Sequence, residues 1–409
     1  MTARGRQSLP VLASDIADYE ALLAKGEFEE AFRFFQARLN APTLMGLEPS
    51  LHRARLLQGL FPDGPDAAPR LSAPRDQASV LYSLALTHNL TGGFPGLAAQ
   101  LYARHDAIAQ ELGDTRALAQ SLGHHAKALR QAGRFRASEG VARRGLIAIR
   151  ETGDLLREAV NLYWLGMGLA HRGDAQGSEA ALNRALRIFQ DRGAKQSQGV
   201  VAAFLAQRAL WLGHYEQALA EAERACAIGA ALERDDAHED HHGAVKIYSA
   251  ALRMKGEALT RIGRVEEGEV ELKDALTWAR RIDFVEEELP ALRALALAAL
   301  RTSRCEDARA HLAATWEKAR RGPFLLYHAD SLNILARVER AENQAEAAVG
   351  AAHEAFRLAW CDGPPFAYAH GLEEAAATLV DLGHSLPLLP PHNPGDFAPL
   401  PNVVIDPDR

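Results

Sequence analysis

The sequence predicts an all-α fold, a right-handed α-solenoid of helix–turn–helix repeats, and three observations support this fold class. Residues suited to tight turns recur about every 40 positions, and small side chains recur at fixed distances from those turns. Aromatic residues make up only 7% of the 409 residues, which favours closely packed helices over sheets. A fixed period between about 20 and 50 residues indicates an array of repeats rather than two or three globular domains.

Eight turn positions set the period. Successive positions lie 40 residues apart, except for a first step of 41 and one step of 50 in the middle of the chain. We expect each of them to separate the two helices of a repeat, because Gly and Asn readily adopt the left-handed backbone conformation that follows a helix. The eight positions are Gly92, Gly133, Gly173, Gly213, Gly263, Ser303, Asn343 and Gly383.

Small residues stand on both sides of each turn. The residue seven positions before the turn is always Ala or Gly, and the residue four positions earlier is Leu in seven of the eight repeats. Residues four apart share one face of a helix, so the first helix of each repeat presents a large and a small apolar side chain together. Mostly small residues also stand five positions after the turn. The pattern predicts two helices of about 15–17 residues that approach each other closely.

The turn segments QAGRFRAS (131–138), HRGDAQGS (171–178), WLGHYEQA (211–218) and RIGRVEEG (261–268) resemble those of the tetratricopeptide repeat (TPR) family. The repeat of 40 residues is longer than the family's usual length of about 34 and is similar to the subtype found in kinesin light chains and in bacterial signal-transduction (STAND) ATPases. The resemblance covers about residues 75–385. It implies a scaffold, or a sensor or adaptor arm of bacterial signalling, whose concave groove binds a protein or peptide segment.

Both ends of the array are expected to be covered. We interpret residues 1–73 as an N-terminal helical cap, with a divergent helix pair around Gly26 and a Pro-rich loop that contains one short helix near residues 50–60. The array itself is expected to span residues 74–385 and to end in a lone capping helix. Residues 386–409 form a Pro-rich C-terminal tail that is too apolar for a disordered segment, so we expect it to be extended and to pack back on the array.

Composition and motifs exclude several classes of function. The net charge of −7 argues against a nucleic-acid binder, and the absence of long apolar runs argues against a signal peptide or a membrane span. Three widely separated cysteines fit a reducing cytosol, so a cytoplasmic location is expected. Neither a phosphate-binding G-x-x-x-x-G-K-[ST] loop nor a G-x-S-x-G elbow nor a C-x-x-C pair occurs. We therefore expect no enzyme, no catalytic residue and no cofactor.

One polar cluster has a spacing that could suit a metal ion. It spans residues 235–242, inside the ten extra residues between Gly213 and Gly263. On a helix, His238 and His242 would share a face and could hold a metal as an i, i+4 pair, which leaves a metal-dependent enzyme as one alternative. The competing interpretation is a solvated acidic loop or a helix extension in which these side chains are merely tolerated.

The inner face of the first helices is the predicted binding surface. Counting back 13, 10, 6 and 3 residues from each turn gives positions that should be exposed in the groove. Many of them are arginines, which suit carboxylate and phosphate groups, so the sequence predicts an acidic peptide or protein segment as partner. Alternatively, these arginines are solubilising and pair with neighbouring glutamates. The candidate groove residues are Lys127, Arg130, Tyr163, Met167, Arg253, Glu257, Arg293, Asn333, Arg337 and Arg340.

A further alternative is a regulator whose groove takes a small molecule or a short peptide. It predicts a deep, closed pocket near Tyr163, Met167 and Trp211 rather than an open channel. A nucleic-acid binder is a remote alternative, and its binding would weaken steeply with salt.

Overall fold

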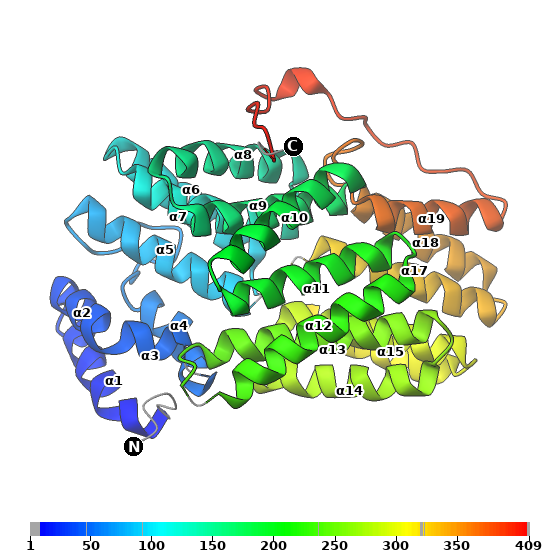
Figure 1. The fold of residues 1–409 in the computed structure, drawn as a ribbon, viewed down its shortest axis with the longest axis horizontal. Helices are drawn as coiled ribbons and strands as arrows, with labels where there is room; N and C mark the ends of the chain where they lie inside the picture. The colour runs from blue at the N-terminus through cyan, green and yellow to red at the C-terminus, as the bar shows by residue number, and fades with distance from the viewer. Residues whose placement is uncertain are drawn as a thin grey trace.

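Paired antiparallel helices wind into a right-handed superhelix in the computed structural model, which describes residues 9–45, 47–91, 93–235, 237–319, 322 and 324–406 (Figure 1). The N-terminal elements are α1 (Leu9–Ala24), α2 (Phe28–Phe34), a π-helical segment (Phe35–Leu39), α3 (Asn40–Met45) and α4 (Leu47–Gln58). Seven helix pairs follow, and the first helix of each pair faces the inside. They are α5 (Pro74–Thr91) with α6 (Pro95–Glu111), α7 (Thr115–Gln131) with α8 (Phe135–Thr152), α9 (Leu155–His171) with α10 (Ala175–Asp191), α11 (Lys195–Trp211) with α12 (Tyr215–Arg234), α13 (His241–Arg261) with α14 (Val265–Arg281), α15 (Val285–Arg301) with α16 (Cys305–Lys318), and α17 (Leu325–Ala341) with α18 (Ala345–Trp360). A single helix, α19 (Ala369–Asp381), ends the array.

The turns between the two helices of a pair have the left-handed backbone conformation that was expected at the periodic turn positions. Gly133, Gly173, Gly213, Gly263 and Gly383 have φ between 74° and 93°. The two turns without glycine, at Ser303 and Asn343, adopt φ of 60°. Gly92 lies outside the described residues.

Small residues allow the two helices of a pair to touch. Between α7 and α8, the Ser138 hydroxyl donates to the Ala126 carbonyl oxygen over 2.7 Å. Between α13 and α14, a Cβ atom added to Gly268 would lie 2.6 Å from the Gly256 carbonyl oxygen. The backbones therefore approach as closely as the pattern of small residues predicts.

The N-terminal segment is more helical than the prolines suggest. We expected residues 41–49 to be irregular, whereas α3 continues directly from the π-helical segment and includes Pro42. Proline has no N–H to close the α-helical ladder, and the wider π-helical turns lie immediately before it. The irregular stretch is thus confined to residues 59–73, between α4 and α5.

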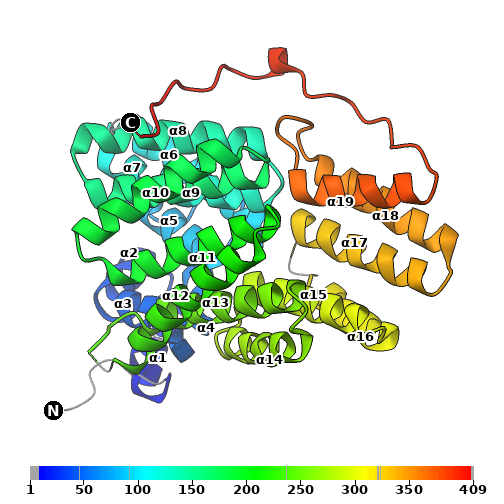
Figure 2. The same cartoon turned by 45° about the vertical axis from the view of Figure 1, so that its right-hand side comes forward.

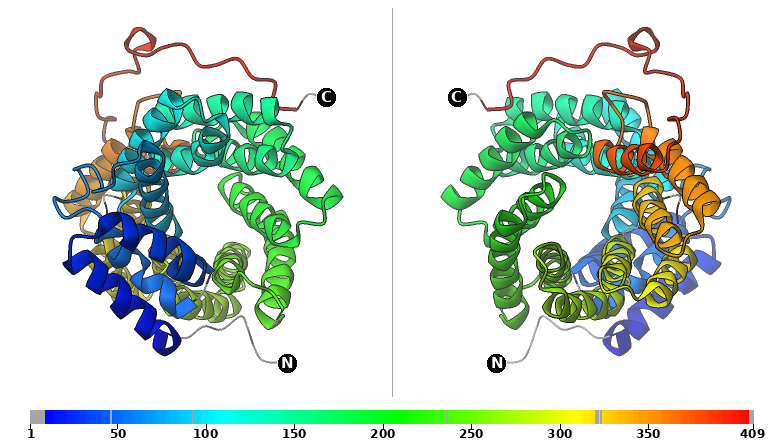
Figure 3. Two further views of the ribbon diagram at one scale, coloured as in Figure 1. Left: turned by 90° about the vertical axis from the view of Figure 1, so that its left-hand side faces the viewer. Right: turned by 90° about the vertical axis from the view of Figure 1, so that its right-hand side faces the viewer.

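The superhelix turns far enough to bring distant repeats face to face. Viewed along its axis, the helices surround a common centre (Figure 3). The N-terminal α3 contacts α13, and the Lys127 ammonium of α7 pairs with the Glu286 carboxylate of α15 over 2.7 Å. Inner helices that are far apart in sequence therefore enclose a shared interior.

The C-terminal tail spans the outside of the molecule. After α19 it runs in extended conformation, with one 3₁₀ turn at Pro394–Asp396, and ends over α8 and α10 (Figures 1 and 2). The Trp360 indole N–H donates to the Pro390 carbonyl oxygen over 2.9 Å, and Arg187 of α10 pairs with Asp406 over 2.6 Å. The tail thus packs back on the array.

None of the described helices is both long and apolar enough to cross a lipid bilayer.

Candidate functional site

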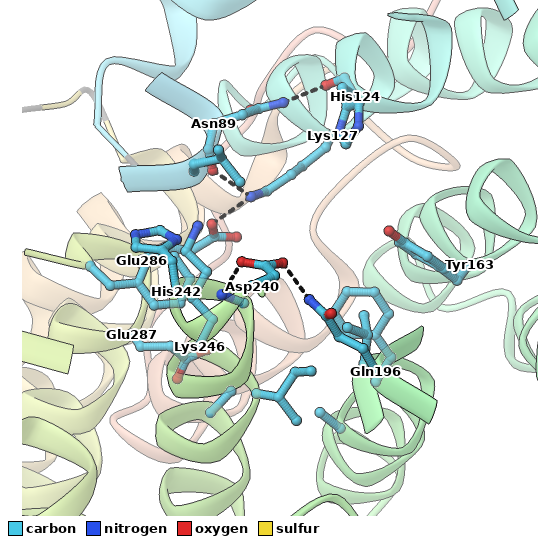
Figure 4. Close-up of a pocket in the computed structure, with 18 of the residues that line it drawn as sticks. Asn89, His124, Lys127, Tyr163, Gln196, Asp240, His242, Lys246, Glu286 and Glu287 are labelled. Carbon is cyan, nitrogen blue, oxygen red and sulfur yellow. Dashed lines mark hydrogen bonds and ion pairs between the residues drawn. The ribbon is translucent and has the colours of Figure 1, made fainter. Parts of the chain in front are cut away.

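A cavity of about 410 Å³ occupies the interior of the superhelix. Its walls come from the inner helices α5, α7, α9, α11, α13 and α15, and Leu44 and Met45 of α3 close one side. Figure 4 shows side chains from these helices pointing toward one another around it. The cavity exists because the first helix of each repeat faces inward and one superhelical turn brings six of these helices around the same space.

Most of the cavity wall is apolar. Trp164 of α9 and Phe204 of α11 lie with their ring centroids 5.4 Å apart, and Tyr163 packs 5.5 Å from Phe204. Ile247 and Met254 of α13 continue this surface. An apolar wall with few polar groups is typical of sites that bind small ligands.

Four of the charged side chains that line the cavity are held by protein partners. Lys127 donates to the Asn89 carbonyl oxygen over 2.8 Å and pairs with Glu286 (Figure 4). Glu287 accepts from Arg253 Nε over 2.6 Å.

Asp240 caps the N-terminus of α13. One of its carboxylate oxygens accepts from the Gly243 backbone N–H over 2.8 Å, and the other accepts from Gln196 Nε2 over 2.6 Å. Both oxygens of this acid are therefore engaged.

The fifth charged side chain, Lys246 of α13, differs from the other four. Its ammonium lies 4.5 Å from the centre of the Phe284 ring, and it forms no ion pair with the residues that the structure describes. Burial lowers the pKa of the Lys246 ammonium well below its ordinary value, and the nearby Lys127 lowers it further. Lys246 therefore places in the cavity a cation that forms no ion pair with the described residues.

A second, smaller cavity of about 70 Å³ lies beside the first and is surrounded by paired charges. Arg293 pairs with Glu257 over 2.6 Å, and Arg253 lies 3.6 Å from the same carboxylate. Desolvation raises the pKa of Glu257, but the three arginines 293, 261 and 253 outweigh it and bring the pKa to about 2. This layer joins α13 to α15 through ion pairs.

The residues expected to line the groove occur in three settings. Lys127 and Tyr163 line the larger cavity, whereas Arg130, Met167, Arg253 and Arg293 line the smaller one. Glu257 and Asn333 are buried beside the smaller cavity or in the helix contacts, where Asn333 Nδ2 donates to the Gly371 carbonyl oxygen over 2.9 Å. Arg337 is half-buried, and Arg340 is exposed and pairs with Asp381 over 3.1 Å.

Most of these positions were expected to be exposed, and the structure buries them. The reason is the closure of the superhelix, which sets inner helices against one another instead of against solvent. Among the interior arginines, Arg253 and Arg293 pair with glutamates, whereas Arg130 lies against His171. Whether these residues contact a partner stays a prediction.

The histidines of the 235–242 segment do not form the i, i+4 pair of the metal-site alternative. Residues 238–242 match the pattern H-E-x-x-H, in which a zinc site requires both histidines on one helix. Here α13 begins only at His241, so His238 lies in the preceding loop while His242 is buried on the helix. Asp236 lies outside the described residues. Among the residues that are described, no group of three or more His, Cys, Asp or Glu side chains could hold a metal ion.

Lys246, Gln196 and Phe204 were not identified from the sequence, and Asp240 was noted only as part of the 235–242 cluster. Lys246 lies 17 residues before Gly263, outside the register used for inner positions, because α13 has 21 residues where most first helices have 17. The signal was present in the step of 50 residues between Gly213 and Gly263. Those extra residues lengthen α12 and α13, and the added turn of α13 forms one wall of the cavity.

Comparison with known proteins supports the fold. No family model matches the chain, and no curated protein matches it in sequence. Among solved structures, a Rap protein complexed with competence and sporulation factor is similar, with a TM-score of 0.55, 13% identity, and coverage of 91% of this chain and 96% of that one. The regulator NprR in complex with its cognate peptide NprX gives a TM-score of 0.54 at 12% identity, covering 92% and 99%. The Rap conjugation gene regulator of plasmid pLS20, in complex with the Phr* peptide, gives 0.51 at 13% identity, covering 92% and 97%. The chain therefore has a TPR-like helical repeat fold that matches these proteins over nearly their full length.

Proposed function

We propose that the protein is a regulatory sensor that binds a short peptide in the enclosed space between its inner helices. The observation that carries this proposal is the cavity of about 410 Å³ on the inside of the superhelix. Pockets of roughly 300–1,000 Å³ with apolar walls and a few convergent polar groups are typical of ligand sites. The enclosure favours a short peptide over a folded partner, because a folded domain could not enter it.

The structural comparisons support the ligand class. Each of the three similar proteins was solved with a peptide or a signalling factor bound, and each overlaps this chain over at least 91% of its residues. At 12–13% identity the likeness concerns the fold, so the peptide ligand is our inference for this chain. We extend the proposal to the long-repeat subtype of the TPR family and to a role in bacterial signalling.

A ligand in this position would influence the whole array. It would touch inner helices from six successive repeats. Binding would therefore favour the pitch of the superhelix that best encloses the ligand and would shift the population toward it. A change in pitch would move the outer helices, so a partner bound to the surface could respond to a ligand in the interior.

The test is to fill the cavity. Ala250 of α13 lines it, and Ala250→Phe would place a ring in the space that the ligand would occupy. A pool of random short peptides is incubated with the protein, and the retained peptides are identified by mass spectrometry after ultrafiltration. We expect the unmodified protein to retain a subset of the pool and Ala250→Phe to lose it. Ala347→Phe, at an exposed position of α18, is the matched control and should retain the same peptides.

Two results would count against the proposal: no peptide retained by the unmodified protein, or the same peptides retained by Ala250→Phe.

A small molecule is the second candidate ligand, because the volume and the apolar wall suit one equally well. It predicts that a metabolite pool raises the melting temperature of the unmodified protein, but not of Ala250→Phe, while no peptide is retained.

A further inference from the structure

The charges around the larger cavity point to the chemistry of its ligand. Lys127, Asp240, Glu286 and Glu287 each engage a protein group at hydrogen-bond or ion-pair distance. Lys246 lines the same cavity, and its described contact is the face of the Phe284 ring 4.5 Å away. An enclosed ammonium is costly unless an anion pairs with it. No described carboxylate lies within ion-pair distance of the Lys246 ammonium, and the charges of Glu286 and Asp240 act on it only from farther away.

We propose that Lys246 binds a carboxylate of the ligand, while the apolar body of the ligand lies against Trp164, Phe204 and Ile247. Within the peptide-sensor function, on which this inference rests, the carboxylate belongs to the C-terminus of a short apolar peptide. Lys127, the other lysine that lines the cavity, already pairs with Glu286 and donates to the Asn89 carbonyl oxygen.

Lys246 lies in the second turn of α13, and both it and the capping residue Asp240 line the cavity. Asp240 already satisfies the N-terminal amides at the cap, and its negative charge partly offsets the ammonium. A carboxylate that entered the cavity would give this ammonium an anionic partner and a strong charge-assisted hydrogen bond.

The hydroxyl of Tyr163 offers a second polar group, across the cavity from Lys246. Figure 4 shows it pointing from α9 into the cavity, on the side opposite Lys246. We infer that it fixes the orientation of the ligand, since a single ammonium leaves a carboxylate free to rotate.

The experiment compares three pools of random N-acetylated pentapeptides made from Ala, Val, Leu, Phe and Ser. The first pool has a free C-terminal carboxylate, the second has a C-terminal amide, and the third has the amide together with one internal Glu. Retention on the full-length protein is measured by ultrafiltration and mass spectrometry, and the best peptide is then titrated by calorimetry. We expect the protein to prefer the free-acid pool over the amide pool by about 10- to 100-fold, the range for a hydrogen bond to a charged group.

The variants separate the role of Lys246 from a general effect on the fold. Lys246→Met keeps the length of the side chain and should abolish the preference for the free acid, whereas Lys246→Arg should retain most of it. Lys255→Met makes the same change on the same helix, at a residue that pairs with Glu271, and should bind as the unmodified protein does. Without ligand, Lys246→Met should melt at the same or a higher temperature, because it removes a buried charge with no bonded partner.

Each outcome decides between the two proposals. Equal retention of the acid and amide pools, or an undiminished preference in Lys246→Met, overturns the carboxylate inference and leaves the peptide sensor intact. Retention of the third pool over the second, lost in Lys246→Met, supports the same chemistry with a side-chain carboxylate as its source. Retention of none of the pools overturns both proposals. The comparison of acid and amide on the unmodified protein stands even if a variant fails to fold.

Discussion

Buried histidines are a feature of the inner helices at the scale of single residues. Burial lowers the pKa of His88 on α5 and of His124 on α7 to about 4, and it lowers the pKa of His171 on α9 and His242 on α13 well below the usual value. In the unfolded chain each imidazole takes up a proton near pH 6.5. Between pH 6.5 and the lower pKa of the folded state, the unfolded chain binds more protons than the folded chain does. The stability that the neutral histidines give above pH 6.5 is therefore lost as the pH falls.

His88 offers the simplest test of this effect. It packs against Phe94, with ring centroids 5.6 Å apart, and its Nε2 atom has no hydrogen-bond partner among the described residues. His88→Leu removes the titration and keeps an apolar side chain. The denaturation midpoint should be nearly unchanged at pH 7.5, and at pH 5 the variant should gain about 2 kcal/mol relative to the unmodified protein.

Urea unfolding followed by circular dichroism at the two pH values measures this difference. His384→Leu, at an exposed position after α19, is the control, because its imidazole stays in water in both states. If His88→Leu lost stability with falling pH as steeply as the unmodified protein, His88 would not contribute to the acid sensitivity.

At the scale of helices and turns, the sequence predicted those features that depend on residues close together in the chain. The 40-residue period located the turns, and even Ser303 and Asn343 adopt the left-handed conformation that a turn of this kind needs. The seven helix pairs and the capping helix follow from that register. The helical conformation of residues 41–45 was missed because a proline counts against a helix locally, while its neighbours stabilise the helix through packing.

The cavity could be predicted only in part, because its walls come from helices that are up to 240 residues apart in the chain. Tyr163 lines the larger cavity, whereas Met167 and Trp211, which one alternative placed around the same closed pocket, line the smaller one. Lys246 was not identified, since its role depends on the closure of the superhelix and on the extra turn of α13. The pairing of Arg253 and Arg293 with glutamates likewise depends on which helices meet across the interior.

The close contact of α13 with α14 yields a prediction about a single methyl group. Gly268→Ala would place a Cβ atom 2.6 Å from the Gly256 carbonyl oxygen and 2.5 Å from Thr260 Oγ1. The helices must then move apart, so we expect a loss of about 1–3 kcal/mol of stability despite the better helix propensity of Ala. Differential scanning calorimetry measures the change.

Gly350→Ala is the matched control for this substitution. Gly350 lies within α18, is exposed, and has no atom within 4 Å of the position of its Cβ. The same change there should raise stability by about 0.5–1 kcal/mol, because Gly costs a helix more than Ala does. Stabilisation at both positions would mean that the two helices are not in tight contact at Gly268.

At the scale of the whole molecule, the C-terminal tail joins parts of the array that are far apart in sequence. It leaves the array at α19 and ends on α8 and α10 (Figure 2). Arg150 donates to the Val404 carbonyl oxygen over 2.7 Å, and Arg143 donates to that of Pro401 over 3.3 Å. Val403 and Ile405 pack against the core of the N-terminal repeats. The array also has contacts across its interior, such as Lys127 with Glu286, and the tail adds a further restraint on the outside.

The ion pair of Asp406 with Arg187 is the contact through which this restraint can be tested. The Asp406 side chain is 4% exposed and lies 2.6 Å from the guanidinium, so Asp406→Lys would set two cations against each other in a nearly dry site. We expect the end of the tail to detach, which would make residues 398–406 sensitive to protease and would speed amide exchange in α8, α10 and α19. Asp396→Lys, in the exposed 3₁₀ turn, makes the same charge change without a buried partner and should leave the exchange of all three helices unaltered. Faster exchange in the tail alone would show that the tail lies on the array without bracing it, whereas faster exchange in α19 as well would show that α19 is mechanically joined to α8 and α10.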